Sequence, residues 1–271
     1  MKAKTVLCIV AHADDLEFMA AGTVIRFAEK GYKVYEVIVT DNSKGSYELS
    51  ADELVRISER EAKNAAEILR LDDLIFLRYK DGELSGVPLN ELREKCMRII
   101  RQLQADVLMT WDPFAPYETH QDHRMVGMAA TEAAHFASMP LFHPEHMRQG
   151  LEPDYVGEVY YFAKNPVDVN KVVDISDQID RKIEALCKHE CQMKLTVDGV
   201  KLEMEAAGIT LPSIASLNRD EYRVLIDAGI RMRAAEIGKE AGFDYAESFR
   251  YEGFDMLRLF APEEVTRIAD F

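Results

Sequence analysis

The sequence predicts an α/β fold: a Rossmann-like, doubly wound, mostly parallel sheet with an elaborated C-terminal half. Through residues 1–140, apolar β-prone runs alternate with amphipathic helical segments, which is typical of parallel strands joined by right-handed crossovers. The 271 residues suffice for one sizeable core. No repeat, low-complexity tract or clear linker divides the chain. We therefore expect a single domain over 1–271, with a core at 1–140 and an elaboration at 141–271.

The first two predicted strands lie within the first 40 residues. Thr5–Val10 is a continuous apolar run, which is typical of a central strand buried on both faces. An amphipathic helix is expected over Glu17–Lys30, with Gly31 just after its end, where a glycine commonly stops a helix. Lys33–Thr40 is the second strand, and its side chains alternate between two faces.

The alternation of strands and helices continues beyond residue 50. In the first half we expect a helix, a strand, a helix, a strand and a helix, at Ala51–Leu71, Leu74–Leu77, Leu89–Gln104, Asp106–Trp111 and Asp122–Phe136. In the second half the signal weakens, and we expect strands at Gly157–Ala163, Lys171–Ile175 and Asp255–Leu259 and helices at Asp177–Met193 and Arg219–Ala241. The commonest doubly wound order, 3-2-1-4, would make the first and fourth strands neighbours.

Composition excludes several classes of function. The formal net charge of −15 argues against a nucleic-acid partner, because nothing in the sequence offsets the repulsion by phosphates. The four cysteines show no disulfide framework and fit a reducing compartment. The N-terminal apolar run is too short for a signal peptide, and no run is long enough to span a membrane. We therefore expect a soluble, cytoplasmic protein.

Two clusters of histidines and carboxylates follow the first and fourth predicted strands. The first cluster is His12, Asp14 and Asp15, and the second is His120, Asp122 and His123. In the 3-2-1-4 order the ends of these two strands adjoin at the switch point of the sheet, where ligands bind. The sequence therefore predicts that the two clusters build one site.

The donor types in these clusters fit a catalytic zinc site. Such a site takes three ligands from histidine and carboxylate and leaves a position for water. His12, Asp15 and His123 would supply this ligand set. The expected cofactor is therefore Zn²⁺.

Asp14 and His120 are left over from the ligand set, and a hydrolase needs such a pair. One carboxylate accepts a proton from the attacking water, and one imidazole donates to the oxyanion or to the leaving amine. Asp122, two residues after His120, could hold that imidazole in the right tautomer. An aspartate at the start of a helix is also a common N-cap, and for Asp122 that explanation is equally good.

The two clusters resemble the signature motifs of the LmbE/PIG-L family of zinc-dependent N-deacetylases. Ala11–Glu17 reads AHADDLE, where the family has AHPDDE or HPDDxE, and His120–His123 reads HQDH, where the family has HPDH. Further similar segments are Gly22-Thr23, Thr40-Asp41, Glu61–Ala66, Asp81-Gly82, Asp174–Ser176, His189–Gln192 and Tyr245–Phe249. The resemblance thus extends over nearly the whole chain.

The resemblance implies an activity and a role for each site residue. Carried over by position, it implies zinc binding by His12, Asp15 and His123, a general base in Asp14, and an acid or oxyanion stabiliser in His120, oriented by Asp122. Enzymes of the family deacetylate the 2-amino group of N-acetylglucosamine-type sugars, so the implied partner is a small sugar conjugate. The chain looks most similar to the bacillithiol-type branch. Family members often form homo-oligomers, and a homo-oligomer would fit the resemblance.

The chain departs from the family pattern near the expected site. Ala13 replaces the usual proline, which loosens the turn without removing a ligand. Ser58 stands where many members carry an arginine that contacts the substrate. Arg56 or Arg60 would be the candidates to replace that arginine, although both also fit a solvated helix face. These departures leave the ligand set intact and change a residue that the resemblance would place against the sugar.

Two other interpretations use the same α/β layout. A nucleotide-binding oxidoreductase needs a Gly-x-Gly-x-x-Gly turn after the first strand, whereas Asp14 and Asp15 at that turn would repel phosphate. A metal-binding protein with an altered substrate or without deacetylase activity is the second alternative. Ser58 leaves an altered substrate open, while Asp14 and His120 argue for retained chemistry.

Overall fold

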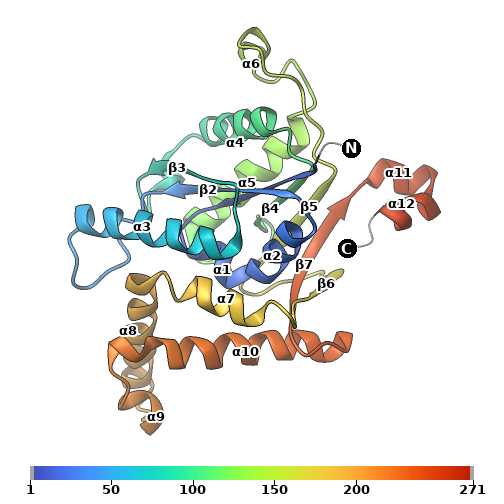
Figure 1. Cartoon of the computed structure of the whole chain (residues 1–271). Helices are drawn as coiled ribbons and strands as arrows, with labels where there is room; N and C mark the ends of the chain where they lie inside the picture. Colours follow the sequence, from blue (N-terminus) through green and yellow to red (C-terminus); the bar gives the residue numbers. More distant parts are fainter. Residues whose placement is uncertain (1–2, 269–271) are drawn as a thin grey trace.

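The computed structural model describes residues 3–268, and its centre is one seven-stranded sheet (Figure 1). The strands are β1 (Thr5–Val10), β2 (Lys33–Thr40), β3 (Asp73–Tyr79), β4 (Val107–Trp111), β5 (Glu158–Phe162), β6 (Lys171–Asp174) and β7 (Ala246–Gly253). Their order in the sheet is β3-β2-β1-β4-β5-β7-β6. The first five pair in parallel, and β7 is antiparallel to both β5 and β6. The predicted mostly parallel α/β sheet with the order 3-2-1-4 is confirmed.

Helices cover both faces of the sheet. Alternate side chains of β1 point to opposite faces, so neighbouring residues pack against different helices. Val6 packs on the face covered by α2 (Ala21–Glu29), α3 (Ala51–Leu69), α7 (Ile179–Leu186) and α10 (Tyr222–Ala241). Leu7 packs on the face covered by α4 (Leu89–Leu103) and α5 (Gln121–Phe136). In Figure 1, α4 lies above the sheet and α7 and α10 lie below it. Because α2 and α5 cover opposite faces, the chain leaves β1 and β4 in different directions and a crevice forms between them.

The remaining helices are the long α8 (Glu190–Ala207) and five short ones. The short helices are α1 (Asp15–Met19), α6 (Pro144–Arg148), α9 (Pro212–Ala215), α11 (Asp255–Phe260) and α12 (Pro262–Ile268), and 3₁₀ turns lie at Leu84–Gly86 and Arg219–Glu221. Figure 1 shows α8 and α9 projecting beyond the sheet, next to α10. Among the described residues, no helix is long and apolar enough to cross a membrane.

The prediction of one helix over Glu17–Lys30 is wrong, because a buried ion pair divides it into α1 and α2. In a continuous helix the Gly22 N–H would donate to the Phe18 carbonyl. Here the Gly22 N–H donates to Oε1 of Glu247 at 2.9 Å, and the Phe18 carbonyl accepts from Nζ of Lys182 at 2.9 Å. Glu247 and Lys182 are themselves paired at 2.6 Å. Residues more than 160 positions away in the sequence thus end α1 just after the predicted site.

Two predictions in the C-terminal half are also wrong. The expected helix Asp177–Met193 is divided into α7 and α8, since the Cys191 N–H at the start of α8 donates to the Glu61 carboxylate at 3.2 Å. The expected strand Asp255–Leu259 is part of the helix α11, and the last strand is β7. Charged residues hide the strand pattern of β7, although Glu247 and Arg250 have partners elsewhere in the fold. Arg250 of β7, for example, pairs with Asp112 at 2.7 Å.

Candidate active site

A cavity of about 630 Å³ opens at the carboxyl ends of β1 and β4. Five of the six predicted site residues line it: His12, Asp14, Asp15, His120 and His123. The sixth, Asp122, is fully buried behind the cavity wall. The structure therefore brings both predicted clusters together, although they lie about a hundred residues apart.

Close packing of α5 against the end of β4 places the second cluster. A Cβ atom on Gly127 of α5 would lie 2.5 Å from the carbonyl oxygen of Trp111, so only glycine permits this approach. The Trp111 ring stacks on the His123 ring, with centroids 3.8 Å apart and an interplanar angle of 8°. The first turn of α5 is thereby held over the end of the central strands.

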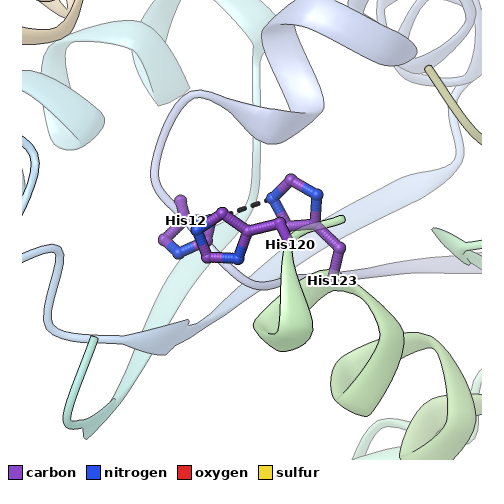
Figure 2. Close-up of side chains that lie close together, drawn as sticks. All are labelled: His12, His120 and His123. Carbon is purple, nitrogen blue, oxygen red and sulfur yellow. Dashed lines mark hydrogen bonds between the residues drawn. The ribbon is translucent and has the colours of Figure 1, made fainter. Parts of the chain in front are cut away.

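Two imidazole nitrogens and one carboxylate converge at the floor of the cavity. Nδ1 of His12 lies 3.1 Å from Nε2 of His123, and Figure 2 shows these two rings meeting beside His120. Oδ1 of Asp15 lies 3.4 Å from Nε2 of His123, and Oδ2 of Asp15 lies 3.7 Å from Nδ1 of His12. Zinc bonds of about 2.0–2.1 Å place tetrahedral ligand atoms about 3.3 Å apart. The donor set and its spacing fit such an ion.

The Asp15 carboxylate is held so that one oxygen is left for a ligand. Its Oδ2 accepts hydrogen bonds from the N–H groups of Ala11 at 3.0 Å and His12 at 2.9 Å and from the Trp111 indole at 2.8 Å. Burial alone would raise the pKa of Asp15, but the neighbouring His123 and His12 rings bring that pKa well below its usual value. Asp15 is therefore an anion oriented by three donors.

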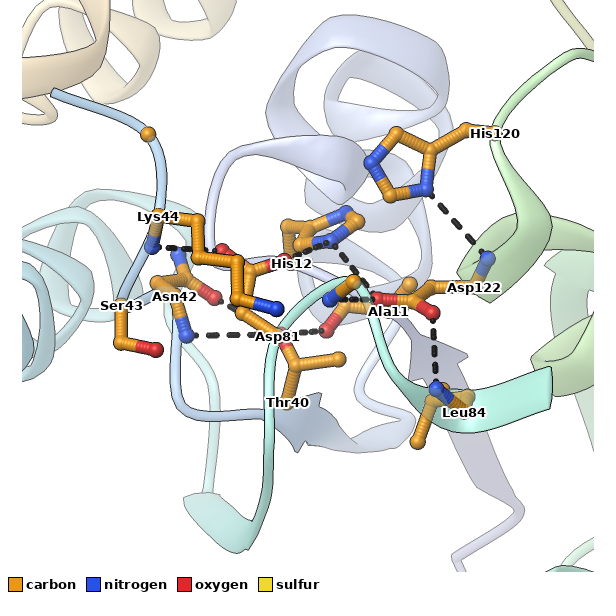
Figure 3. A network of polar contacts seen from close by, with 12 residues as sticks. Ala11, His12, Thr40, Asn42, Ser43, Lys44, Asp81, Leu84, His120 and Asp122 are labelled. Atoms are coloured by element: carbon orange, nitrogen blue, oxygen red, sulfur yellow. Dashed lines mark hydrogen bonds and ion pairs between the residues drawn. The ribbon is translucent and has the colours of Figure 1, made fainter. Parts of the chain in front are cut away.

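Each of the two candidate histidine ligands is backed by a carboxylate. Nε2 of His12 lies 3.2 Å from Asp81 and 3.6 Å from Asp122, and Nδ1 of His123 lies 3.3 Å from Glu118 (Figure 3 shows the His12 side). Histidine ligands of metals usually donate their second N–H to such a partner. The sequence marked Asp81 only as part of a turn and gave no signal for Glu118. Asp81 reaches His12 from a separate loop, and Glu118 reaches His123 from the loop that precedes α5.

The Asp122 carboxylate faces His12 and not the His120 ring that the sequence predicted as its partner. Its carboxylate accepts from the N–H groups of Gly82 at 2.6 Å and Leu84 at 3.1 Å, and it faces His12 (Figure 3). Among residues 3–268, no hydrogen bond joins this carboxylate to the His120 ring. The predicted carboxylate–imidazole pair is therefore replaced by a link between α5 and the loop after β3.

The His120 ring is oriented by the main chain instead. Its Nδ1 accepts the Asp122 backbone N–H at 3.3 Å, so His120 is the N-cap of α5. An Nδ1 that accepts leaves Nε2 to carry the proton of the neutral ring. Burial, and then the nearby His12 and His123 rings, lower the pKa of His120. The ring is therefore suited to donate as a neutral imidazole.

Asp14 combines access to the cavity with a free carboxylate. It occupies the N-cap position of α1 but makes no side-chain capping hydrogen bond, so the ordinary capping explanation does not account for it. Within the described part of the chain, its carboxylate has no hydrogen-bond donor. Burial and the charge of Asp15 raise the pKa of Asp14. A carboxylate of this kind is suited to accept a proton.

The position of the missing family arginine is filled by a buried polar pair. Ser58 is buried, and its hydroxyl accepts a hydrogen bond from Nδ2 of Asn42 at 2.9 Å. Asn42 lines the cavity with a left-handed backbone (φ 55°), which asparagine tolerates well. Arg56 donates to the Asp52 carbonyl at 3.2 Å, and neither Arg56 nor Arg60 lines the cavity. Asn42 therefore lines the cavity at this place, with its amide nitrogen bonded to Ser58.

A second histidine cluster lies around α6, outside the cavity. His143, Glu145 and His146 are close enough to share an ion. However, Nε2 of His146 lies 2.9 Å from Glu94 and its Nδ1 lies 3.0 Å from the Arg101 guanidinium. Because an arginine occupies the space beside Nδ1, this cluster is a structural hydrogen-bond network.

Comparisons with known proteins find similar deacetylases. Residues 7–134 match the family model PIG-L, described as GlcNAc-PI de-N-acetylase. The diacetylchitobiose deacetylase of Thermococcus kodakarensis is 35% identical over 92% of this chain and 83% of its own length. A probable N-acetyl-alpha-D-glucosaminyl L-malate deacetylase of Bacillus anthracis is 26% identical over 80% of this chain and 93% of its own. An inhibitor complex of the N,N'-diacetylchitobiose deacetylase of Pyrococcus horikoshii superposes with a TM-score of 0.75 and 28% identity, covering 93% of this chain and 85% of that one.

Proposed function

This chain belongs to the PIG-L family of deacetylases, and we propose that it uses zinc to remove the acetyl group from the 2-amino group of an N-acetylglucosamine conjugate. As a member it is an amide hydrolase that acts on GlcNAc-containing substrates. The observation that carries the proposal is the convergence of two imidazole nitrogens and a carboxylate at 3.1–3.7 Å on the cavity floor.

His12, Asp15 and His123 are the residues that would hold the ion. Nε2 of His12 is hydrogen-bonded to Asp81, and Nδ1 of His123 lies 3.3 Å from Glu118, so Nδ1 of His12 and Nε2 of His123 are the nitrogens that would face the ion. When bound, zinc supplies Lewis acidity, which makes a water more acidic and polarises the amide carbonyl. The carboxylates behind the histidines fix both rings before any substrate arrives.

Asp14 acts as the general base in this proposal. It is next to Asp15 in the sequence and lines the same cavity, yet its carboxylate is not engaged by other donors. It therefore takes a proton from the attacking water and holds it at a carboxylate oxygen. The raised pKa of Asp14 makes that proton transfer more favourable.

His120 stabilises the charge that develops on the substrate. As water attacks the amide, negative charge accumulates on the carbonyl oxygen, and a donor placed there lowers the barrier. Nε2–H of His120 is that donor, because Nδ1 is occupied by the Asp122 N–H. The same ring can pass its proton to the departing amine. Asp122 contributes through its main chain to His120 and through its carboxylate to His12.

Acetate release from defined sugars tests the proposal. The zinc-loaded protein is incubated with N-acetylglucosamine, N,N'-diacetylchitobiose and simple N-acetylglucosaminides, and free acetate and free amine are measured together. Equal amounts of both products, abolished when zinc is removed, are the expected result. A zinc-loaded protein that deacetylates none of these sugars would instead support a metal-binding protein without this activity.

A further inference from the structure

Two buried residues of the segments that resemble the family, Glu17 and His189, take no part in the proposed chemistry. Glu17 ends the segment AHADDLE and lies on α1, whereas His189 is the N-cap of α8. Both side chains are 1% exposed, and Nε2 of His189 lies 3.3 Å from Oε1 of Glu17. Neither residue lines the cavity. The fold thus buries a histidine–carboxylate pair in the wall that carries Asp14.

The charges around this pair favour an imidazolium facing a carboxylate. Burial alone would lower the pKa of His189, but Glu17, and then Asp14 and Glu61, raise that pKa above its usual value. The buried Glu36 of β2 has its pKa raised well above the usual value by burial and then by the charge of Glu17. Glu36 is therefore neutral, and the His189 imidazolium balances the Glu17 carboxylate.

The main chain next to His189 is anchored to other walls of the cavity. The Cys191 N–H donates to the carboxylate of Glu61 on α3 at 3.2 Å. Nε2 of Gln192, which lines the cavity, donates to the Gly45 carbonyl in the loop after β2, also at 3.2 Å. These contacts fix the junction of α7 and α8, so His189 meets α1 from a fixed position.

Asp14 depends on this pair more than Asp15 does. Asp15 has three hydrogen-bond donors of its own at 2.8–3.0 Å, from the end of β1 and from β4. Among the described residues, no donor holds the Asp14 carboxylate. The position of Asp14 therefore follows from the backbone of α1, and Glu17 ties α1 to His189.

We propose that His189 is a positioning residue of the deacetylation, which through Glu17 holds α1 so that Asp14 faces the attacking water. This inference rests on the proposed deacetylase function and deepens it. Because neither member of the pair lines the cavity, the pair acts only through α1. Its loss should lower kcat and leave KM and zinc binding in place, since substrate and zinc contact other residues.

Kinetics of zinc-loaded variants on a sugar that the wild type deacetylates test this proposal. His189→Leu keeps a similar side-chain size but leaves the Glu17 carboxylate without its partner. We expect kcat to fall about tenfold or more, as for a misplaced catalytic group, and KM to stay within about twofold. One zinc per chain should remain bound. His189→Gln should recover most of the loss, because its amide can still donate to Glu17.

A double-mutant cycle connects the effect to the pair. Glu17→Gln keeps the shape of its side chain and should also lower kcat, which provides the same test where His189→Leu does not fold. The double variant Glu17→Gln/His189→Leu should lose no more than the worse single variant, because both changes remove one interaction. Additive losses would overturn the proposal.

His146→Leu is the matched control. His146 is also fully buried and lies 2.9 Å from a carboxylate oxygen of Glu94, but it lies outside the cavity. Its replacement should lower stability and leave kcat unchanged. An unchanged kcat in His189→Leu, a loss of kcat that follows a loss of zinc, or an equal loss in His146→Leu would overturn the proposal.

Nuclear magnetic resonance of ¹⁵N-labelled histidine gives a measurement without turnover. The His189 signals are identified by their absence in His189→Gln. We expect both ring nitrogens to carry protons at neutral pH in the wild type and the signals to shift in Glu17→Gln; a neutral ring, or unshifted signals, would overturn the pair. A wild type that shows the pair but deacetylates none of the sugars would overturn only the proposed function.

Discussion

Replacement of Glu247 by glutamine tests the account of how α1 is ended. The Glu247 carboxylate accepts four hydrogen bonds: from the Gly22 N–H at 2.9 Å, the Thr23 N–H at 2.8 Å, the Thr23 hydroxyl at 2.6 Å and the Lys182 ammonium at 2.6 Å. The side chains of Glu247 and Lys182 are both 4% exposed. Glu247→Gln keeps the shape of the side chain but removes its charge.

The expected loss follows from the charge that is left behind. Without Glu247, the Lys182 ammonium keeps only the Phe18 carbonyl as a described partner. Removing one member of a buried ion pair typically costs about 3–5 kcal/mol, because the other charge stays buried. The free energy of unfolding of an ordinary domain is about 5–15 kcal/mol, so Glu247→Gln should lose a large part of it.

Urea unfolding of four proteins measures this effect: wild type, Glu247→Gln, Lys182→Met and the double variant. The double variant should be less destabilised than the sum of the two single variants, because it leaves no unpaired buried charge. A loss below about 1 kcal/mol in Glu247→Gln, or strict additivity in the double variant, would refute the reasoning.

Three further predictions follow from the contacts around the site and in the scaffold. Asp14→Asn should retain zinc and lose about a hundredfold or more in kcat, because the amide cannot accept a proton; near-normal acetate release by the zinc-loaded variant would remove Asp14 from the mechanism. Glu118→Gln should weaken zinc binding about 10–100-fold in a chelator competition, since it alters the partner of His123; unchanged affinity would show that Glu118 does not position that ring. Burial would raise the pKa of Glu94, but hydrogen bonds from His146 and Arg98 lower it from 4.5 to about 2. The stability from this depressed pKa is present above pH 4.5 and is lost as the pH falls toward 2, so Glu94→Gln should flatten the loss of thermal stability in that window; an unchanged acid profile would contradict this.

The fold was predictable wherever a segment shows its own periodicity. β1 is apolar on both faces and β4 nearly so, and their positions in the sheet follow from the common doubly wound order. The errors fall where distant side chains decide the structure. No local pattern reveals that Glu247 will take the N–H groups that a continuous helix would use, or that Arg250 will be neutralised by Asp112 within a strand.

In the candidate site, too, local sequence patterns were informative and contacts between separate segments were not predictable. His12 and His123 were predictable, because histidine next to carboxylate at a strand end is an unusual local composition. The carboxylates behind them were not, since Asp81 and Glu118 reach the histidines only through the folded loops. The contacts of the Asp122 carboxylate were not predictable for the same reason, because the N–H groups of Gly82 and Leu84 donate to it from the loop after β3.

A zinc titration of the metal-free protein tests the central claim most directly. Acetate release is measured from a sugar that the wild type deacetylates while zinc is added in known equivalents per chain. The account predicts that acetate release rises linearly and reaches its maximum at about one zinc per chain. In His12→Ala, Asp15→Ala and His123→Ala, acetate release should no longer reach a maximum at one equivalent of zinc. Full turnover in the metal-free wild type, or an unchanged titration in all three variants, would contradict the proposed zinc centre.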